Sequence, residues 1–128
     1  MMPWKQGRCL VWDVTCPDTL APSHLNRAVT GAGAVASEAE SKKRLKYEQI
    51  SRIFHFVPVA VETLGALGED AAAFMRDLGA RITTVTKERR AYEFLMQRVS
   101  VAIQRGNAAC ILGTLHSTSE LDDIFYLI

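Results

Sequence analysis

Cysteine is scarce in this sequence of 128 residues, since only three occur, an odd number with no CxxC spacing. This pattern argues against a disulfide framework and against a zinc site, and it indicates a reducing compartment. The three histidines are scattered, with no spacing typical of a metal site. The first residues lack the apolar core of a signal peptide. No apolar run approaches the ~20 residues needed to cross a bilayer, so we expect a soluble, intracellular protein.

A strong excess of one charge is also absent, because the formal net charge is +1. The charges are nevertheless unevenly spread: residues 42–105 hold twelve basic and seven acidic side chains, and acids gather near the C-terminus. A basic middle is compatible with a phosphate-bearing partner but does not demand one. Apolar and charged contents of 48% and 23% are ordinary for a soluble globular protein, and the length suits one domain.

Two apolar runs predict strands. The first, Cys9–Cys16, follows a Gln6-Gly7 turn, so the preceding residues around Trp4 are expected to form a hairpin with it. The second covers residues 56–61 and contains Pro58, which indicates that one backbone donor there needs no partner. With the helices described next, these strands predict an α/β fold, a small mixed sheet flanked by helices with a helical C-terminal half.

Apolar side chains at spacings of three and four predict three helices. One runs from Val35 to Phe54, and a second opens at or just before Asp70 with a buried stripe and a break near Thr83–Thr86. The last spans Glu88 to about Thr114, where Gly106 indicates a kink or close packing. The stripe of the second helix comprises Ala71, Phe74, Met75, Leu78 and Ile82.

Asp13 stands in the middle of the first apolar strand. Its neighbours are all apolar, so we expect a partly desolvated carboxylate, and a divalent metal or a lysine would offset the cost of that burial. The alternative is an edge-strand aspartate that faces water. A second acid, Glu62, lies at the end of the second apolar run, where it either joins a site or caps the turn at residues 63–65.

Polar residues interrupt the apolar face of the helix that is predicted between the two strands. Glu40, Lys43 and Tyr47 share one face at spacings of three and four, and Lys46 also interrupts the apolar line. A lysine in such a place can stabilise charge on a phosphoryl group or hold an attacking water. The alternative is a snorkelling lysine or a weak surface pair between Glu40 and Lys43.

Other basic residues on the helices could hold a nucleic-acid backbone, or they could simply form solvated helical faces. The candidates are Lys42, Arg44, Arg89, Arg90, Arg98 and Arg105.

Four segments carry a family resemblance: PWKQGRCLVWDVTCPDTLAPSH, AESKKRLKYEQI, FVPVAVETLG and FLMQRVSVAIQRGNAACILGT. Together they resemble the restriction-enzyme-like endonuclease, of the PD-(D/E)XK superfamily, at the C-terminal end of retroelement reverse-transcriptase polyproteins. The resemblance covers about residues 3 to 115, and its more specific parts are WDVT and AExxKxxKY. Residues 116–128 are expected to form a C-terminal tail outside the domain, which would occupy residues 1–115.

The resemblance implies a metal-dependent hydrolase that nicks its target DNA. Asp13 and Glu40 would then bind Mg²⁺ or Mn²⁺, and Lys43 or Lys46 would position water with Tyr47 alongside. Thr15 stands where the superfamily usually has its lysine, and the resemblance assigns that function to the following helix. DNA is the implied partner, with a nuclear location if the target is chromosomal; the oligomeric state stays open.

One feature of the family pattern has no counterpart, namely the Pro-Asp pair that should precede Asp13. The chain begins just after that point, and Pro17-Asp18 follows the strand, so it is no substitute. We therefore expect a truncated copy that binds metal weakly and cleaves DNA poorly or not at all. The alternatives are a non-catalytic nucleic-acid-binding remnant and an interaction domain with no nucleic acid.

Overall fold

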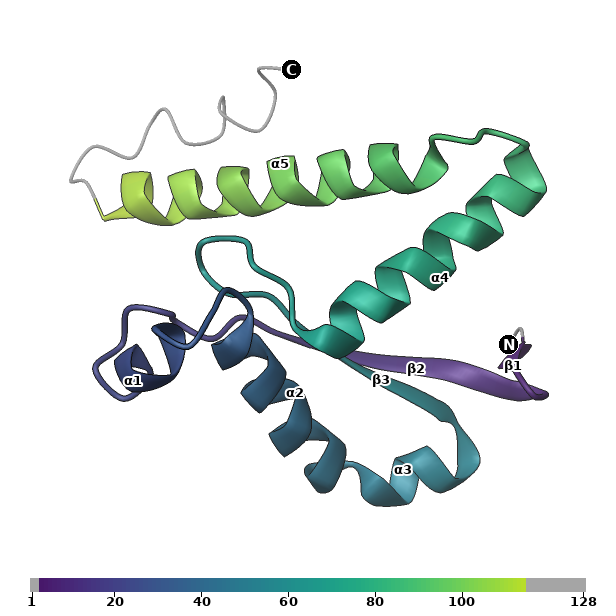
Figure 1. The fold of residues 1–128 in the computed structure, drawn as a ribbon, viewed down its shortest axis with the longest axis horizontal. Coiled ribbons are helices and arrows are strands. Elements are labelled where there is room, and N and C mark those ends of the chain that lie inside the picture. The colour runs from purple at the N-terminus through teal and green to yellow at the C-terminus, as the bar shows by residue number, and fades with distance from the viewer. Residues whose placement is uncertain (1–2, 115–128) are drawn as a thin grey trace.

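A three-stranded mixed sheet lies between two groups of helices in the computed structural model, which describes residues 3–114 (Figure 1). This arrangement, with a helical C-terminal half, confirms the predicted fold class. The elements are β1 (Pro3–Lys5), β2 (Arg8–Thr15), α1 (Leu25–Ala28), α2 (Ala34–Lys46), α3 (Glu48–Ile53), β3 (His55–Ala60), α4 (Glu69–Thr86) and α5 (Ala91–Gly113).

The sheet has the order β1-β2-β3. β1 and β2 form the predicted antiparallel hairpin, and its turn places Gln6 and Gly7 in the left-handed region, at φ 50° and 73°. Two consecutive positive φ angles suit the tight turns that match the twist of antiparallel strands. β3 pairs with β2 in parallel, in a register that runs from Leu10 opposite His55 to Thr15 opposite Ala60.

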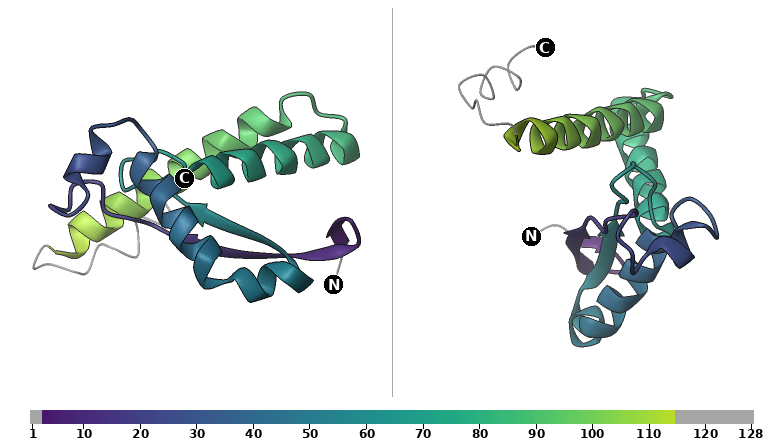
Figure 2. Two further views of the ribbon diagram at one scale, coloured as in Figure 1. Left: turned by 60° about the horizontal axis from the view of Figure 1, so that its bottom comes forward. Right: turned by 90° about the vertical axis from the view of Figure 1, so that its left-hand side faces the viewer.

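Side-chain alternation divides the sheet into two faces. Val57 and Val59 of β3 turn toward α4, whereas Asp13 of β2 turns toward α2. Figure 2 shows these helices on opposite sides of the strands. The apolar neighbours of Asp13 are only partly buried, since Trp12 and Val14, on the α4-facing side of β2, are each 57% exposed. Beyond Cys9, β2 has β3 as its single partner strand within residues 3–114.

The core lies between the sheet and α4. Its buried residues are Val57, Val59, Ala71, Phe74 and Met75. Three of these belong to the predicted stripe of α4, and the other two stripe residues are half-buried. α5 packs against α4 and brings Leu95, Met96 and Val99 to the same core.

Helix boundaries differ from the prediction in three places. The single helix expected from Val35 to Phe54 is broken at Tyr47, whose φ of −107° and ψ of 25° separate α2 from α3. The ring of Tyr47 packs on Phe56 of β3, with 5.2 Å between centroids, so sheet packing holds the break. α4 continues through the expected break to Thr86, and α5 begins at Ala91 and runs without interruption through Gly106.

Within residues 3–114, no helix is long and apolar enough to cross a membrane. The expected tail, residues 116–128, lies outside the described part of the chain.

Candidate functional site

Asp13 and Lys43 meet on the α2 side of the sheet. The Nζ atom of Lys43 lies 2.5 Å from Oδ2 of Asp13, and the two side chains are 25% and 32% exposed. Asp13 occupies the middle of β2, where strand alternation turns it away from α4. Lys43 lies in the last turn of α2, and the structure therefore brings together the two residues on which the predicted site most depends.

Tyr47 forms a wall of this site. Its ring centre lies 5.9 Å from the ammonium of Lys43 and 5.2 Å from that of Lys46. Lys46 itself is exposed, so it does not lie on the buried face of α2 as the sequence predicted. The hydrogen bond to the carboxylate of Asp13 raises the pKa of Lys43, which therefore stays charged at neutral pH.

Glu40 is 2% exposed and serves as a remote cap for α4. Its Oε1 accepts hydrogen bonds from the backbone N–H groups of Ala60 and Ala71, at 3.2 and 2.8 Å, and its Oε2 accepts one from Asp70 at 2.8 Å. Burial raises the pKa of Glu40, while these three donors act in the opposite direction. Both carboxylate oxygens are thus used inside the fold.

Glu62 has the same role at α2. It is 3% exposed, and its Oε1 accepts the N–H groups of Val35 and Ala36 at 3.1 and 3.3 Å. The hydroxyl of Thr19 donates to its Oε2 at 3.4 Å. Of the two alternatives for Glu62, the cap of the turn at residues 63–65 is wrong, because its carboxylate caps a helix that lies earlier in the chain.

The glycines at the starts of α2 and α4 are a feature of the sequence from which the two capping glutamates could have been predicted. Gly33 and Gly68 occupy the N-cap positions of α2 and α4, where no side chain can accept the free N–H groups of the first turn. A Cβ atom on Gly68 would lie 2.3 Å from Cδ of Glu40. Glycine there leaves room for the carboxylate that does the capping.

The residues do not fit the metal site that the resemblance implies. Asp13 is held by Lys43, and both oxygens of Glu40 accept backbone hydrogen bonds. In the described part of the chain, no three His, Cys, Asp or Glu side chains lie close enough together to hold a metal ion. A divalent cation would have to displace backbone donors to bind Glu40, and at Asp13 it would meet the positive charge of Lys43.

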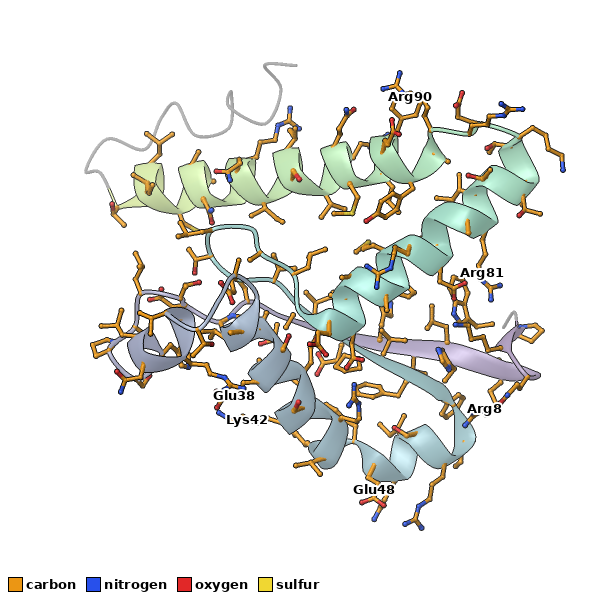
Figure 3. All side chains as sticks on the ribbon, in the orientation of Figure 1. Arg8, Glu38, Lys42, Glu48, Arg81 and Arg90 are labelled. Carbon is orange, nitrogen blue, oxygen red and sulfur yellow. The ribbon has the colours of Figure 1, made fainter. Side chains whose placement is uncertain are left out.

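The predicted nucleic-acid-binding residues fall into two separate groups. Lys42 pairs with Glu38 at 2.7 Å and Arg44 pairs with Asp70, both from α2. Arg98 and Arg105 lie in α5, on the other side of the sheet, and Arg89 and Arg90 lie in the turn just before it (Figure 3). Of these, Arg90 pairs with Glu93, at 2.9 Å. For Arg89, Arg98 and Arg105 the structure records no ion pair within residues 3–114, and no single surface unites the two groups.

Comparison of the chain with protein-family models, with curated proteins and with solved structures finds no match. The functional argument therefore depends on the geometry of the residues themselves.

Proposed function

We propose that this chain is a divergent restriction-enzyme-like nuclease domain of the retroelement type, which binds DNA but cleaves it weakly or not at all. The ion pair between Asp13 and Lys43 carries the proposal. The resemblance implies an acid on a strand and a lysine on the following helix, and these two residues, 30 apart in the chain, form such a pair.

We infer weak or absent cleavage because the carboxylates of Asp13 and Glu40 already have partners in the fold. The metal-dependent reaction needs carboxylates that are free to bind a cation. Glu40 instead stabilises the start of α4, and Asp13 neutralises the lysine that would otherwise act on phosphate. We therefore derive no cleavage step for the described residues.

Binding of a phosphate is the function that the remaining groups support. The ammonium groups of Lys43 and Lys46 lie 5.9 and 5.2 Å from the centre of the Tyr47 ring, so both cations are available to a DNA backbone that passes beside this ring. A phosphate would compete with Asp13 for Lys43. Such contacts are independent of base sequence and weaken as salt rises, because binding releases counterions from the DNA.

The proposal is tested with a fluorescent DNA duplex and with supercoiled plasmid. In anisotropy titrations between about 50 and 200 mM NaCl, two phosphate contacts predict a slope of about −2 in log K against log salt. In the plasmid assay, we expect little or no nicking with Mg²⁺ or Mn²⁺. Absence of salt-dependent binding would reject the proposal, and efficient nicking that Asp13→Asn abolishes would reject the impairment while supporting the ancestry.

A second candidate, an interaction domain without nucleic acid, is favoured by the exposed side of β2. Trp12 and Val14 leave apolar surface in solvent beside a strand edge, and such edges can accept a strand from a partner. A domain of this kind should show no salt-dependent affinity for DNA. The anisotropy experiment therefore separates the two candidates.

A further inference from the structure

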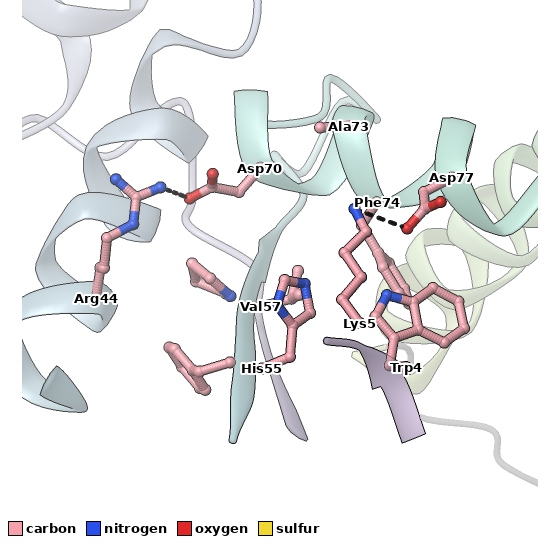
Figure 4. Close-up of a pocket in the computed structure, with 11 residues that line it drawn as sticks. Trp4, Lys5, Arg44, His55, Val57, Asp70, Ala73, Phe74 and Asp77 are labelled. Atoms are coloured by element: carbon pink, nitrogen blue, oxygen red, sulfur yellow. Dashed lines mark hydrogen bonds and ion pairs between the residues drawn. The ribbon is translucent and has the colours of Figure 1, made fainter. Parts of the chain in front are cut away.

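A cavity of about 220 Å³ lies on the opposite flank of β3 from β2, between α2 and α4 (Figure 4). β1 closes it through Trp4 and Lys5, and His55 contributes to its wall from the start of β3. Neither Asp13 nor Lys43 lines it, so it is separate from the site described above. Its volume is below the roughly 300–1,000 Å³ of pockets for drug-sized ligands, which suits a single heterocycle.

Unused hydrogen-bonding capacity gathers beside this cavity. The buried Nε1–H group of Trp4 has no acceptor within residues 3–114. Asp77 pairs through Oδ2 with Lys5 at 3.0 Å and through Oδ1 with Arg81 at 3.5 Å. Since each carboxylate oxygen can accept more than one donor, Asp77 can still accept a further hydrogen bond from a ligand. Among the described residues, the indole N–H of Trp4 is therefore the buried group beside the cavity that lacks a polar partner. Buried polar groups of this kind usually find a partner, in protein, water or ligand.

The walls combine aromatic surface with balanced charge. Trp4 and Phe74 both line the cavity, with ring centroids 5.7 Å apart. The guanidinium of Arg81, outside the lining, covers one face of the Trp4 ring at 3.8 Å from its centre. The Lys5–Asp77 ion pair lies at one side of the cavity and the Arg44–Asp70 pair at the other. Because cations and carboxylates are paired, a net charge on the ligand would gain little. A neutral flat ring with donors and acceptors on its edges matches these walls.

We propose that this cavity binds a nucleobase, with guanine the best fit. The guanine edge offers N–H donors to the carboxylate of Asp77 and acceptors to the indole N–H of Trp4. Aromatic side chains stack on bases with little dependence on strand context. The base can come from a free nucleoside or from a single strand. This inference goes beyond the proposed phosphate contacts at Lys43 and does not require them.

Tryptophan fluorescence reports on binding directly. The variant Trp12→Phe leaves Trp4 as the sole tryptophan, and guanosine, adenosine and cytidine are titrated into it. We expect saturable quenching that is tightest for guanosine. Asp77→Asn in the same background should weaken guanosine about tenfold, as expected for loss of one edge contact. The matched control Glu69→Gln, on the same helix but outside the cavity, should leave the affinity unchanged.

A second measurement separates loss of the ligand contact from local unfolding of the β1–β2 hairpin. Trp4→Phe keeps an aromatic ring and deletes the indole N–H, so calorimetry should show weaker guanosine binding while circular dichroism is unchanged. A single-guanine oligonucleotide that binds more tightly than guanosine identifies a strand as the source of the base, and equal affinity identifies the free nucleoside. Quenching that does not saturate, or that is the same for all nucleosides and in Asp77→Asn, overturns the proposal and leaves water as the occupant.

Discussion

Replacing Glu40 should cost more stability than any other acid-to-alanine change in α2. Three backbone N–H groups donate to its carboxylate, from Ala60, Asp70 and Ala71. In Glu40→Ala the two buried donors and the part-buried N–H of Asp70 lose their acceptor, at about 1–3 kcal/mol each. Allowing for the longer bond from Ala60, we expect a loss of roughly 4 kcal/mol, a large part of the ~5–15 kcal/mol that stabilises a small domain.

Glu40→Gln provides a graded version of the same test. The amide oxygen can still accept two of the hydrogen bonds, but the amide nitrogen would face the N–H of Asp70, donor against donor. We expect a loss of roughly half that of the alanine variant. The matched control is Glu38→Ala, two residues earlier on the same helix, whose carboxylate pairs only with exposed cations.

Urea unfolding followed by far-UV circular dichroism gives the required free energies. The midpoints should fall in the order Glu38→Ala, Glu40→Gln, Glu40→Ala, with Glu38→Ala near the parent and with unchanged slopes. A loss below about 1 kcal/mol for Glu40→Ala would refute the capping role, because the two buried donors alone cannot lose their acceptor at so small a cost.

Three further predictions concern other positions. A Cβ on Gly68 would lie 2.3 Å from Glu40 Cδ, so Gly68→Ala should lower the free energy of unfolding by roughly 2 kcal/mol. The loss should be far smaller when Glu40 is already alanine, because the clash is then gone. Additive losses in the double variant would contradict this. Gly106→Ala, which meets nothing within 4 Å, should stabilise α5 by up to ~1 kcal/mol, and a lower melting temperature would argue against a regular helix there. Burial, with Lys5 and Arg8 nearby, lowers the pKa of His55 from its ordinary 6.5. Because the unfolded chain then binds the proton more readily, the stability of the parent should fall relative to His55→Gln as pH drops below about 6.5. Parallel pH profiles of the two proteins would refute this prediction.

Much of the fold could be predicted from the sequence because its signals are local. The hairpin follows from the Gln6-Gly7 turn, and α4 from an apolar stripe of regular period. The approach of Lys43 to Asp13 could be predicted because the long helix between two neighbouring strands packs against one side of a small sheet. The break at Tyr47 could not, since it depends on the packing of its ring against β3.

The roles of the two buried glutamates were not predicted, because their partners lie far along the chain. Glu40 caps a helix that begins 29 residues later, and Glu62 caps one that begins 28 residues earlier. Spacing within α2 shows only that Glu40 shares a face with Lys43, which suggests a common site. The structure instead separates them: Glu40 is buried and caps α4, whereas Lys43 is part-exposed and pairs with Asp13.

The most direct test of the proposed function measures DNA affinity in Asp13→Asn and Lys43→Met at low salt, with folding checked by circular dichroism. If phosphate competes with Asp13 for Lys43, the two changes act in opposite directions: Asp13→Asn should bind DNA more tightly than the parent, and Lys43→Met more weakly with a slope shallower by about one. Equal affinities in all three proteins, or weaker binding in Asp13→Asn, would contradict the claim that this ion pair marks the site for a DNA phosphate.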